Sequence, residues 1–324
     1  MTVQAKRVVA VLMFLSLAAT ARAQTKLPTE TRNAALRYWL AFADLQDPPA
    51  DKATSNLLEK TVAGEAVWDE AKLGSILDKN ETAIWRMQRA TKLPECDWGL
   101  EYHLGPRASI AYVPKARVLA RLNTLYGMRL AAKGETQKAV DTWLAGIRFS
   151  QHLASGGSLI FTLVAKMGLV SNFHALTQAA QSGALSSAQK RQIEAATRAL
   201  PDTGLDWGRA LRYEEDPLNV GVKQMAEAAS PAAYYQEMMG SPAPENFVLP
   251  TVAETTSFHK LVASAEDALR LPPDMASQRL KTIQESAKRL HPFFRDAMPS
   301  LTRINDARIE TQAARQKLLQ AVTP

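Results

Sequence analysis

Apolar residues recur at helical spacing along most of this chain, and proline or glycine interrupts the pattern wherever one segment ends. No alternation of strand and helix patterns supports a parallel sheet. Helices joined by short turns pack as antiparallel neighbours, so we expect an all-α fold, an irregular array of antiparallel helical hairpins. The predicted helices are a first one ending before Asp47, then 52–62, 67–92, several between 115 and 182, 187–200, 205–229, 231–239, 252–270, 273–290 and 299–322.

The periodicity also predicts which side chains face the core near the start of the chain. The first helix, capped by Thr29 or Thr31, has the apolar positions Leu36, Trp39, Leu40 and Phe42. In the helix 67–92 the inward residues are Trp68, Leu73, Ile76, Leu77, Ile84, Trp85 and Met87. The sequence Asp-Lys-Asn at 78–80 predicts a break in that helix.

Residues 1–23 have the pattern of a secretory signal peptide. A short basic region precedes the apolar run Val8–Ala19, which is too short to span a bilayer, and Ala21-Arg22-Ala23 is a small-residue cleavage site. We therefore expect cleavage near Ala23/Gln24 and export to the periplasm or the cell exterior. No cysteine follows the site, so we expect no lipid anchor at the new N-terminus. We also expect no transmembrane segment in the mature chain.

The remaining chain divides by composition into three parts. We expect a helical domain over 24–239 with a repeat-like centre at 115–182, a proline-rich loop at 240–250, and C-terminal helices over 251–324 that pack on the same body. The net charge of +7 becomes +4 on cleavage, because three basic residues and no acidic residue leave with the signal. This mild charge is spread along the chain and does not indicate nucleic acid as a partner.

One predicted hairpin has the small and large residues of a tetratricopeptide repeat, at Gly127, Leu130, Gly134, Ala139 and Trp143. Gly127 and Ala139 would let two helices approach closely, and Trp143 would fill the space beside them. Gly134 suits the turn, since glycine adopts positive φ at a helix C-terminus. The pattern does not recur at an offset of about 34 residues, so we expect one repeat-like hairpin and not a solenoid.

Three further features accompany this hairpin: the A-x-x-x-W spacing in the run that begins at Lys133, the sequence GGSLI at 156–160, and the sequence CDWG at 96–99 after Pro94. Together they resemble an uncharacterised family of exported α-helical proteins from large-genome environmental bacteria. The resemblance covers Pro94 to Leu176. It implies the all-α class and carries no catalytic residue.

The irregular segment between Pro94 and Pro114 contains the densest group of reactive side chains, in the sequence ECDWGLEYH at 95–103. Functional groups favour loops that a rigid scaffold holds at a surface. The alternative is a structural loop held by the packing of a tryptophan and by carboxylate–arginine contacts. The candidate ligand-binding residues are Trp98, Glu101, Tyr102, His103 and Arg107.

Two groupings are candidates for hydrolytic chemistry. Cys96 and His103 could form a nucleophile and its base, although no third orienting group is identifiable. Glu214 and Glu215 could work as paired carboxylates on a glycan, although acidic clusters on helices are usually solvated faces. We assign no catalytic residue from these patterns.

Metal and cofactor signals are weak throughout. His152 and His174 have apolar helical neighbours typical of core histidines, and His259 and His291 have no partner at ligand spacing. No phosphate-binding or dinucleotide motif is present, so we expect neither a metal nor a cofactor. Cys96 is the single cysteine, so it is either buried or able to pair only with another chain.

The glycine pair at 156–157 and Ser158 precede a predicted helix. Helix N-termini can bind anions through free N–H groups. Two glycines followed by serine are more typical of a tight turn with a serine cap, which is what we expect here.

These observations favour a non-enzymatic, exported helical protein that binds an envelope protein or peptide. The alternative is a cell-envelope hydrolase that uses the carboxylates or the Cys96–His103 loop, and a third possibility is a bundle that holds a small apolar ligand between helices. A binding protein predicts an open groove lined by exposed aromatic and charged side chains. An enzyme predicts a closed pocket with ionisable groups within hydrogen-bond reach.

Overall fold

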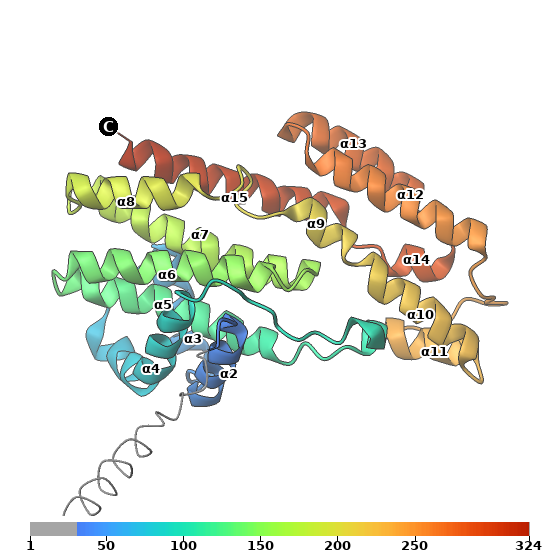
Figure 1. Cartoon of the computed structure of the whole chain (residues 1–324), viewed down its shortest axis with the longest axis horizontal. Coiled ribbons are helices and arrows are strands. Elements are labelled where there is room, and N and C mark those ends of the chain that lie inside the picture. The colour runs from blue at the N-terminus through green and yellow to red at the C-terminus, as the bar shows by residue number, and fades with distance from the viewer. Residues whose placement is uncertain (1–30, 324) are drawn as a thin grey trace, which may run out of the picture. The chain divides into compact units, whose positions relative to one another are not determined.

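A computed structural model describes residues 31–323, and they form an all-α fold, as predicted (Figure 1). The chain divides after Arg32, and the description below concerns the unit that begins at Asn33. No strand forms within the described residues, where an isolated bridge joins Asn33 to Glu95. The expected signal peptide at 1–23 and the possible cap Thr29 lie outside the described residues.

The helices follow one another with short connections. The first are α2 (Ala34–Asp44), α3 (Lys52–Ala63) and α4 (Glu70–Ala90). After the short 3-10 helix η1 (Tyr102–Arg107) come α5 (Tyr112–Ala132), α6 (Thr136–Ala154), α7 (Leu159–Gln181) and α8 (Ser187–Arg198). The last are α9 (Trp207–Arg212), α10 (Glu215–Glu227), α11 (Pro231–Met239), α12 (Val252–Leu269), α13 (Pro273–Ala287), α14 (Pro292–Ala297) and α15 (Leu301–Val322).

Local signals account for most of these boundaries. Ser186 begins α8 with a capping box in which its hydroxyl accepts from Gln189 N–H and the Gln189 side chain accepts from Ser186 N–H. Thr251 begins α12 with the same motif. Gly240 ends α11 in the left-handed conformation, with φ of 67°. The first helix is capped by Asn33, whose side-chain oxygen accepts from Ala35 N–H at 3.0 Å, and not by Thr31.

The predicted break at 78–80 is wrong, because α4 is continuous through it. Asn80 is buried, and its side chain donates to the carbonyl of Gln46 at 3.0 Å and accepts from Gln46 N–H at 2.8 Å. Asparagine often marks a turn because it bonds to local backbone. Here the side chain donates to the carbonyl of Ile76 in its own helix, at 2.9 Å, as well as bonding to the loop after α2, so it joins two elements without ending a helix.

Four of the side chains predicted to face inward are exposed instead. Leu36, Trp39 and Leu40 of α2 keep 55%, 43% and 46% of their surface accessible, and Trp85 of α4 keeps 52%. Both helices are amphipathic, but a different face meets the core. The buried residues of α2 are Ala34, Ala35, Tyr38, Ala41 and Phe42. Small alanines on that face let α2 pack closely on α4, which the larger leucines would prevent.

Helices α5, α6 and α7 form the centre of the fold and pack on one another along their lengths (Figure 1). A Cβ on Gly127 of α5 would lie 2.3 Å from Trp143 Nε1 of α6, so only glycine allows this approach. The close glycine–tryptophan contact of the predicted hairpin is therefore present. Its tetratricopeptide-like character stays a prediction.

Helix α7 is the one helix of the described residues that is long and apolar enough to cross a membrane. Its most apolar stretch has a mean hydropathy of 1.5, and 67% of that stretch is buried. The helix packs against α5, α6 and α15, which accounts for its composition. The sequence had led us to expect no apolar run of this length after the signal peptide.

The last helix, α15, packs on α7 and α8 and also on α13. Two buried arginines of α15, two helical turns apart, cap the C-terminal ends of two other helices. Arg315 donates to the carbonyls of Thr197 and Leu200 at the end of α8, at 3.2 and 3.4 Å. Arg308 donates to the carbonyls of Leu269 and Leu271 at the end of α12, both at 3.0 Å. Cations are favourable at helix C-termini, so α15 joins the ends of two helices that lie far apart in sequence.

The chain between α4 and α5 leaves the central helices and returns, and η1 lies where it turns back (teal in Figure 1). Its turn packs on α10 so closely that a Cβ on Gly105 would lie 2.7 Å from Val220 Cγ1. Gln224 of α10 donates to the carbonyl of Leu104 at 3.3 Å. We call residues 94–111 the connecting arm, because they tie the central helices to α10.

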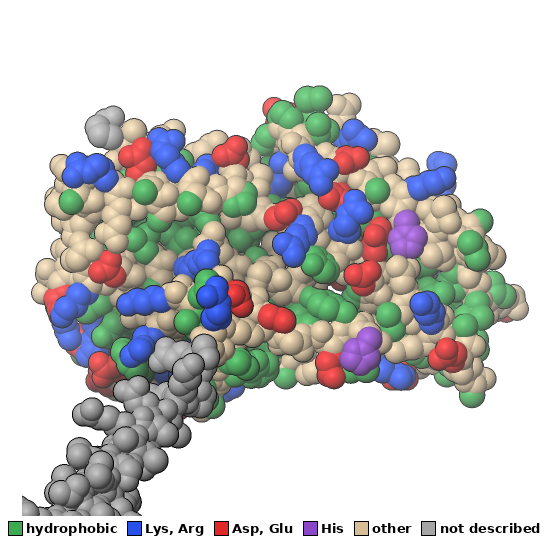
Figure 2. Space-filling model, in the orientation of Figure 1, with side chains coloured by type: hydrophobic (Ala, Val, Ile, Leu, Met, Phe, Trp, Pro, Cys, Tyr) green, Lys and Arg blue, Asp and Glu red, His purple; other side chains and the backbone are tan. Residues whose placement is uncertain are grey.

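The predicted helix 205–229 is two helices, α9 and α10, with the interruption at Tyr213 and Glu214. The structure also adds the short helix α14, which begins at Pro292 and is capped by His291. At both places a side chain contacts another element: Glu214 bonds to the start of α7, and His291 bonds to the carbonyl of Val248. On the face that Figure 2 shows, basic and acidic side chains are interspersed.

Candidate functional site

The predicted binding residue Trp98 lies in the core. Its indole N–H donates to the carbonyl of His152 at 2.8 Å, and its ring stacks on Tyr112 with centroids 4.6 Å apart. Only 5% of its surface is accessible. This side chain holds the connecting arm against α5 and α6, as the structural alternative for the loop anticipated.

The other four candidates lie at the surface in different surroundings. Glu101 and His103 are exposed, and Arg107 forms an exposed ion pair with Glu237 of α11 at 3.0 Å. Tyr102 is half-buried, and its hydroxyl donates to the carbonyl of Gly156. No side-chain hydrogen bond, ion pair or ring contact joins any two of the five candidates within residues 31–323.

Cys96 is half-buried, with a free thiol. Burial raises the pKa of that thiol to about 12, so it stays protonated at neutral pH. A nucleophilic cysteine needs the opposite, a pKa lowered by a nearby base or cation. Among the described residues no hydrogen bond connects Cys96 with His103.

The two carboxylates proposed as a pair have separate partners. Glu214 Oε1 accepts from the backbone N–H of Leu159, the first residue of α7, at 2.7 Å. Ser158 forms no side-chain cap, so the expected serine cap is wrong and Glu214 takes its place from a distant element. Burial raises the pKa of Glu214. Glu215 instead lies 3.3 Å from Nδ1 of His259.

Two of the histidines, His152 and His291, make structural contacts. His152 is buried, and its Nδ1 shares a hydrogen bond of 2.7 Å with the Tyr38 hydroxyl. His291 accepts from Phe293 N–H at the start of α14, and its other nitrogen lies 3.0 Å from the carbonyl of Val248. Within the described part of the chain, no three His, Cys, Asp or Glu side chains are grouped so that they could hold a metal ion.

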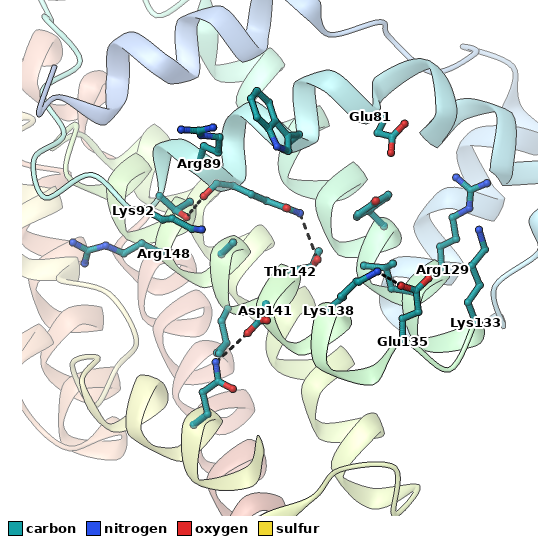
Figure 3. A pocket seen from close by; sticks show the side chains of 18 of the residues that line it. Glu81, Arg89, Lys92, Arg129, Lys133, Glu135, Lys138, Asp141, Thr142 and Arg148 are labelled. Carbon is teal, nitrogen blue, oxygen red and sulfur yellow. Dashed lines mark hydrogen bonds and ion pairs between the residues drawn. The ribbon is translucent and has the colours of Figure 1, made fainter. Parts of the chain in front are cut away.

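A groove that the sequence patterns did not indicate is hollowed into the described surface. It lies between α4 and α8, over the α5–α6 hairpin, and has a volume of about 890 Å³. Figure 3 shows the side chains that line it. We call it the basic groove, because six cations and four acids line it: Arg89, Lys92, Arg129, Lys133, Lys138 and Arg148, with Asp78, Glu81, Glu135 and Asp141.

One end of the basic groove carries cations without carboxylate partners. Arg89, Lys92 and Arg148 lie near one another there (Figure 3), and none of them has an ion pair within residues 31–323. Arg148 donates only to the neutral side chain of Gln151, at 3.3 Å. The guanidinium of Arg89 lies over the exposed ring of Trp85, 5.0 Å from its centroid. This end therefore offers positive charge beside an apolar surface.

The other end is largely neutralised within the protein. Arg129 donates to Asp78 at 2.6 Å and also binds Glu70, while Lys138 pairs with Glu135 (Figure 3). The Glu70 contact holds the pKa of Arg129 above its usual value. Lys133, at the turn of the hairpin, has no ion pair in the described structure.

The floor between the two ends is polar and held in place. Gln88 of α4 donates to Asn123 Oδ1 at 3.0 Å, and Asn123 donates to the carbonyl of Thr142 at 2.9 Å. Asn123 is fully buried, and Thr142 nearly so. This network fixes the spacing of α4, α5 and α6 beneath the groove, so that the cations project from a rigid base.

The groove's cations occur at helical spacing in the sequence. Trp85 and Arg89 are four residues apart on α4, Lys92 follows in the turn after that helix, and Lys138 and Arg148 share the exposed side of α6. That spacing indicates only two polar helix faces. Nothing local indicates that the faces meet. No family model, no curated protein and no solved structure matches this chain.

Proposed function

We propose that this chain is a non-enzymatic, exported binding protein that holds an acidic segment of an envelope protein or peptide in the basic groove. The single observation that carries the proposal is the group Arg89, Lys92 and Arg148, three cations that line one groove and have no ion pair in the described structure. The guanidinium of Arg89 also lies over the exposed ring of Trp85. Arginine beside an exposed aromatic ring is typical of the residues that dominate protein interfaces.

The chemistry of this end selects the partner. Carboxylates would pair with the three cations, and an apolar or aromatic side chain next to them would cover Trp85. The groove is open to solvent and its acids are exposed or paired, which fits binding better than catalysis. The separate partners of Cys96, Glu214 and Glu215 also favour binding.

A direct test uses the full protein and short labelled peptides. One peptide is rich in aspartate and glutamate with a central phenylalanine, a second replaces the phenylalanine with serine, and a third is its lysine counterpart. Fluorescence anisotropy should rank the acidic aromatic peptide first. Its affinity should fall as salt rises, because exposed charges are screened. Equal binding of the acidic and basic peptides would refute the proposal.

Variants locate the binding to the groove. Arg148→Gln and Lys92→Gln should each lower the affinity for the acidic peptide by roughly tenfold, which corresponds to about 1.4 kcal/mol. Trp85→Ser should lower the affinity for the peptide with phenylalanine and leave the affinity for the peptide with serine unchanged. Lys281→Gln on α13 is the matched control, since Lys281 is exposed and remote from the groove lining. Losses as large in the control as in the groove variants would refute the assignment.

Export rests on residues 1–23 alone and has its own test. The chain expressed in a bacterial host should appear in the periplasm or medium with Gln24 as its first residue. Fractionation and N-terminal sequencing give the answer. An uncut chain in the cytoplasm would contradict export and leave the groove experiment unaffected.

A further inference from the structure

A second, solvent-open cavity lies on another side of the central helices, lined by residues of α3, α5, α7 and α15. Its volume is about 290 Å³, near the lower end of the range for small-molecule sites. No residue that lines it also lines the basic groove. We call it the α3–α7 cavity.

One wall of this cavity concentrates positive charge. Arg117 and Arg121 lie one turn apart on α5 and both line it. Like charges at this spacing repel each other on a helix. Arg121 is half-buried and has a single ion pair, to Glu59 at 3.3 Å. Arg117 has no ion pair within the described residues.

The electrostatics of Arg121 agree with a surplus of charge. Burial lowers the pKa of its guanidinium, and the neighbouring Arg117 lowers it further. Across the cavity, Lys166 of α7 is already bound to Glu310 of α15 at 2.5 Å. The carboxylates of the lining therefore leave one arginine of the pair uncompensated.

Apolar side chains line part of the opposite side, which we call the apolar wall: Val164, Met167 and Val170 of α7 and Val62 of α3. The polar residues Lys166, Ser171 and His174 of α7 also line the cavity. Met167 keeps 42% of its surface accessible, although a methionine of a core helix is usually covered. At the base of the cavity, α7 and α5 approach closely at Gly168. A Cβ added to Gly168 would lie 3.2 Å from the Cβ of Ala120.

We propose that the α3–α7 cavity binds a small organic anion with a short alkyl chain, such as a medium-chain monocarboxylate. Its carboxylate would lie between Arg117 and Arg121, and its chain would cover Val164, Met167 and Val170. An inorganic anion would leave the apolar wall unused. A whole phospholipid would exceed the volume.

The test is calorimetric titration of the full protein with octanoate, octanol and acetate. Octanoate should bind at least tenfold more tightly than either of the other two, because only octanoate uses both walls. Binding of octanol as tight as octanoate would show a merely apolar cavity and overturn the proposal. Binding of acetate as tight as octanoate would show a simple surface arginine effect and overturn it as well.

Variants separate this cavity from the basic groove. Arg117→Gln should lower the affinity for octanoate about tenfold, and Met167→Ser should lower it several-fold. Both residues are exposed, so the fold should survive, and unchanged thermal unfolding without ligand verifies this. Arg148→Gln in the groove is the control and should leave octanoate binding unchanged. Equal effects of Arg117→Gln and Arg148→Gln would refute the assignment.

Discussion

His152 is the residue whose surroundings most depend on its charge. It is buried beside Tyr38 and Trp98, and burial lowers its pKa to about 4. Its Nε2 is buried without a hydrogen-bond partner in the described structure. A proton on this ring would leave an unpaired buried charge, so the folded protein holds His152 neutral.

The unfolded chain protonates this histidine near pH 6.5, and the folded chain only near pH 4. Between these values the unfolded state binds more protons, so stability rises with pH by about 1.4 kcal/mol per pH unit from this group. Urea unfolding at several pH values should show that slope. His152→Asn should flatten it, and His103→Asn, which changes an exposed histidine, should preserve it. An unchanged slope in His152→Asn would contradict the assignment.

Gly127 sets the distance between α5 and α6. A methyl group there would meet Trp143, whose indole N–H donates to the carbonyl of Thr124 at 3.1 Å. We expect Gly127→Ala to lower the free energy of unfolding by about 1–3 kcal/mol through overpacking. Adding Trp143→Leu should make the same change less harmful, because the clash disappears. A double-mutant cycle measures this coupling, and strict additivity would refute it.

At the scale of elements, side chains from other elements satisfy the ends of three helices, α7, α8 and α12. Glu214 caps α7, and Arg308 and Arg315 of α15 cap α12 and α8. Unsatisfied backbone groups at buried helix ends are costly, so these contacts link the stability of one helix to the placement of another. The interruption between α9 and α10 at Glu214 places that carboxylate at the start of α7.

Glu214→Ala should lower the free energy of unfolding by about 1 kcal/mol, the usual effect of losing an N-cap acceptor. Glu214→Gln should be milder, because its amide oxygen can still accept from Leu159 N–H. Denaturant unfolding gives both values. Glu245→Ala in the exposed loop after α11 serves as a control with no expected effect. The assignment fails if the glutamine variant is as unstable as the alanine variant.

At the scale of the whole described unit, two connections unite helices that the sequence separates: α15 and the connecting arm. The arm is held at one end by Trp98 and at the other by η1 on α10. The exposed Arg107–Glu237 pair adds little, since exposed ion pairs contribute about 0–1 kcal/mol. Close packing at Gly105, with φ of 61°, is the stronger contact.

Gly105→Ala should release the arm from α10, because its methyl group would meet Val220. Limited proteolysis should then cleave within 94–111 several-fold faster than in the unsubstituted protein. Gly134→Ala is the matched control, with positive φ of 78° but open space around the added Cβ. It should show backbone strain without release of the arm. Equal cleavage in both variants would contradict the docking.

Much of the secondary structure follows from the sequence alone. The prediction of α11 at 231–239 agrees at both ends, and α8 and α12 agree to within a few residues. Their signals are local: a cap or capping box at the start, and for α11 also a glycine at the end. Such signals act within a few residues and need no tertiary partner.

The tertiary structure alone decides which side of a helix is covered. Trp39 and Trp85 were expected in the core and are exposed, while Tyr38 is buried. The same holds for the candidate site. Trp98 belongs to the core, and the basic groove exists because α4 and α6 bring their polar faces together. Periodicity determines that a helix has two faces, but the choice between them depends on packing energies contributed by residues far away in the chain.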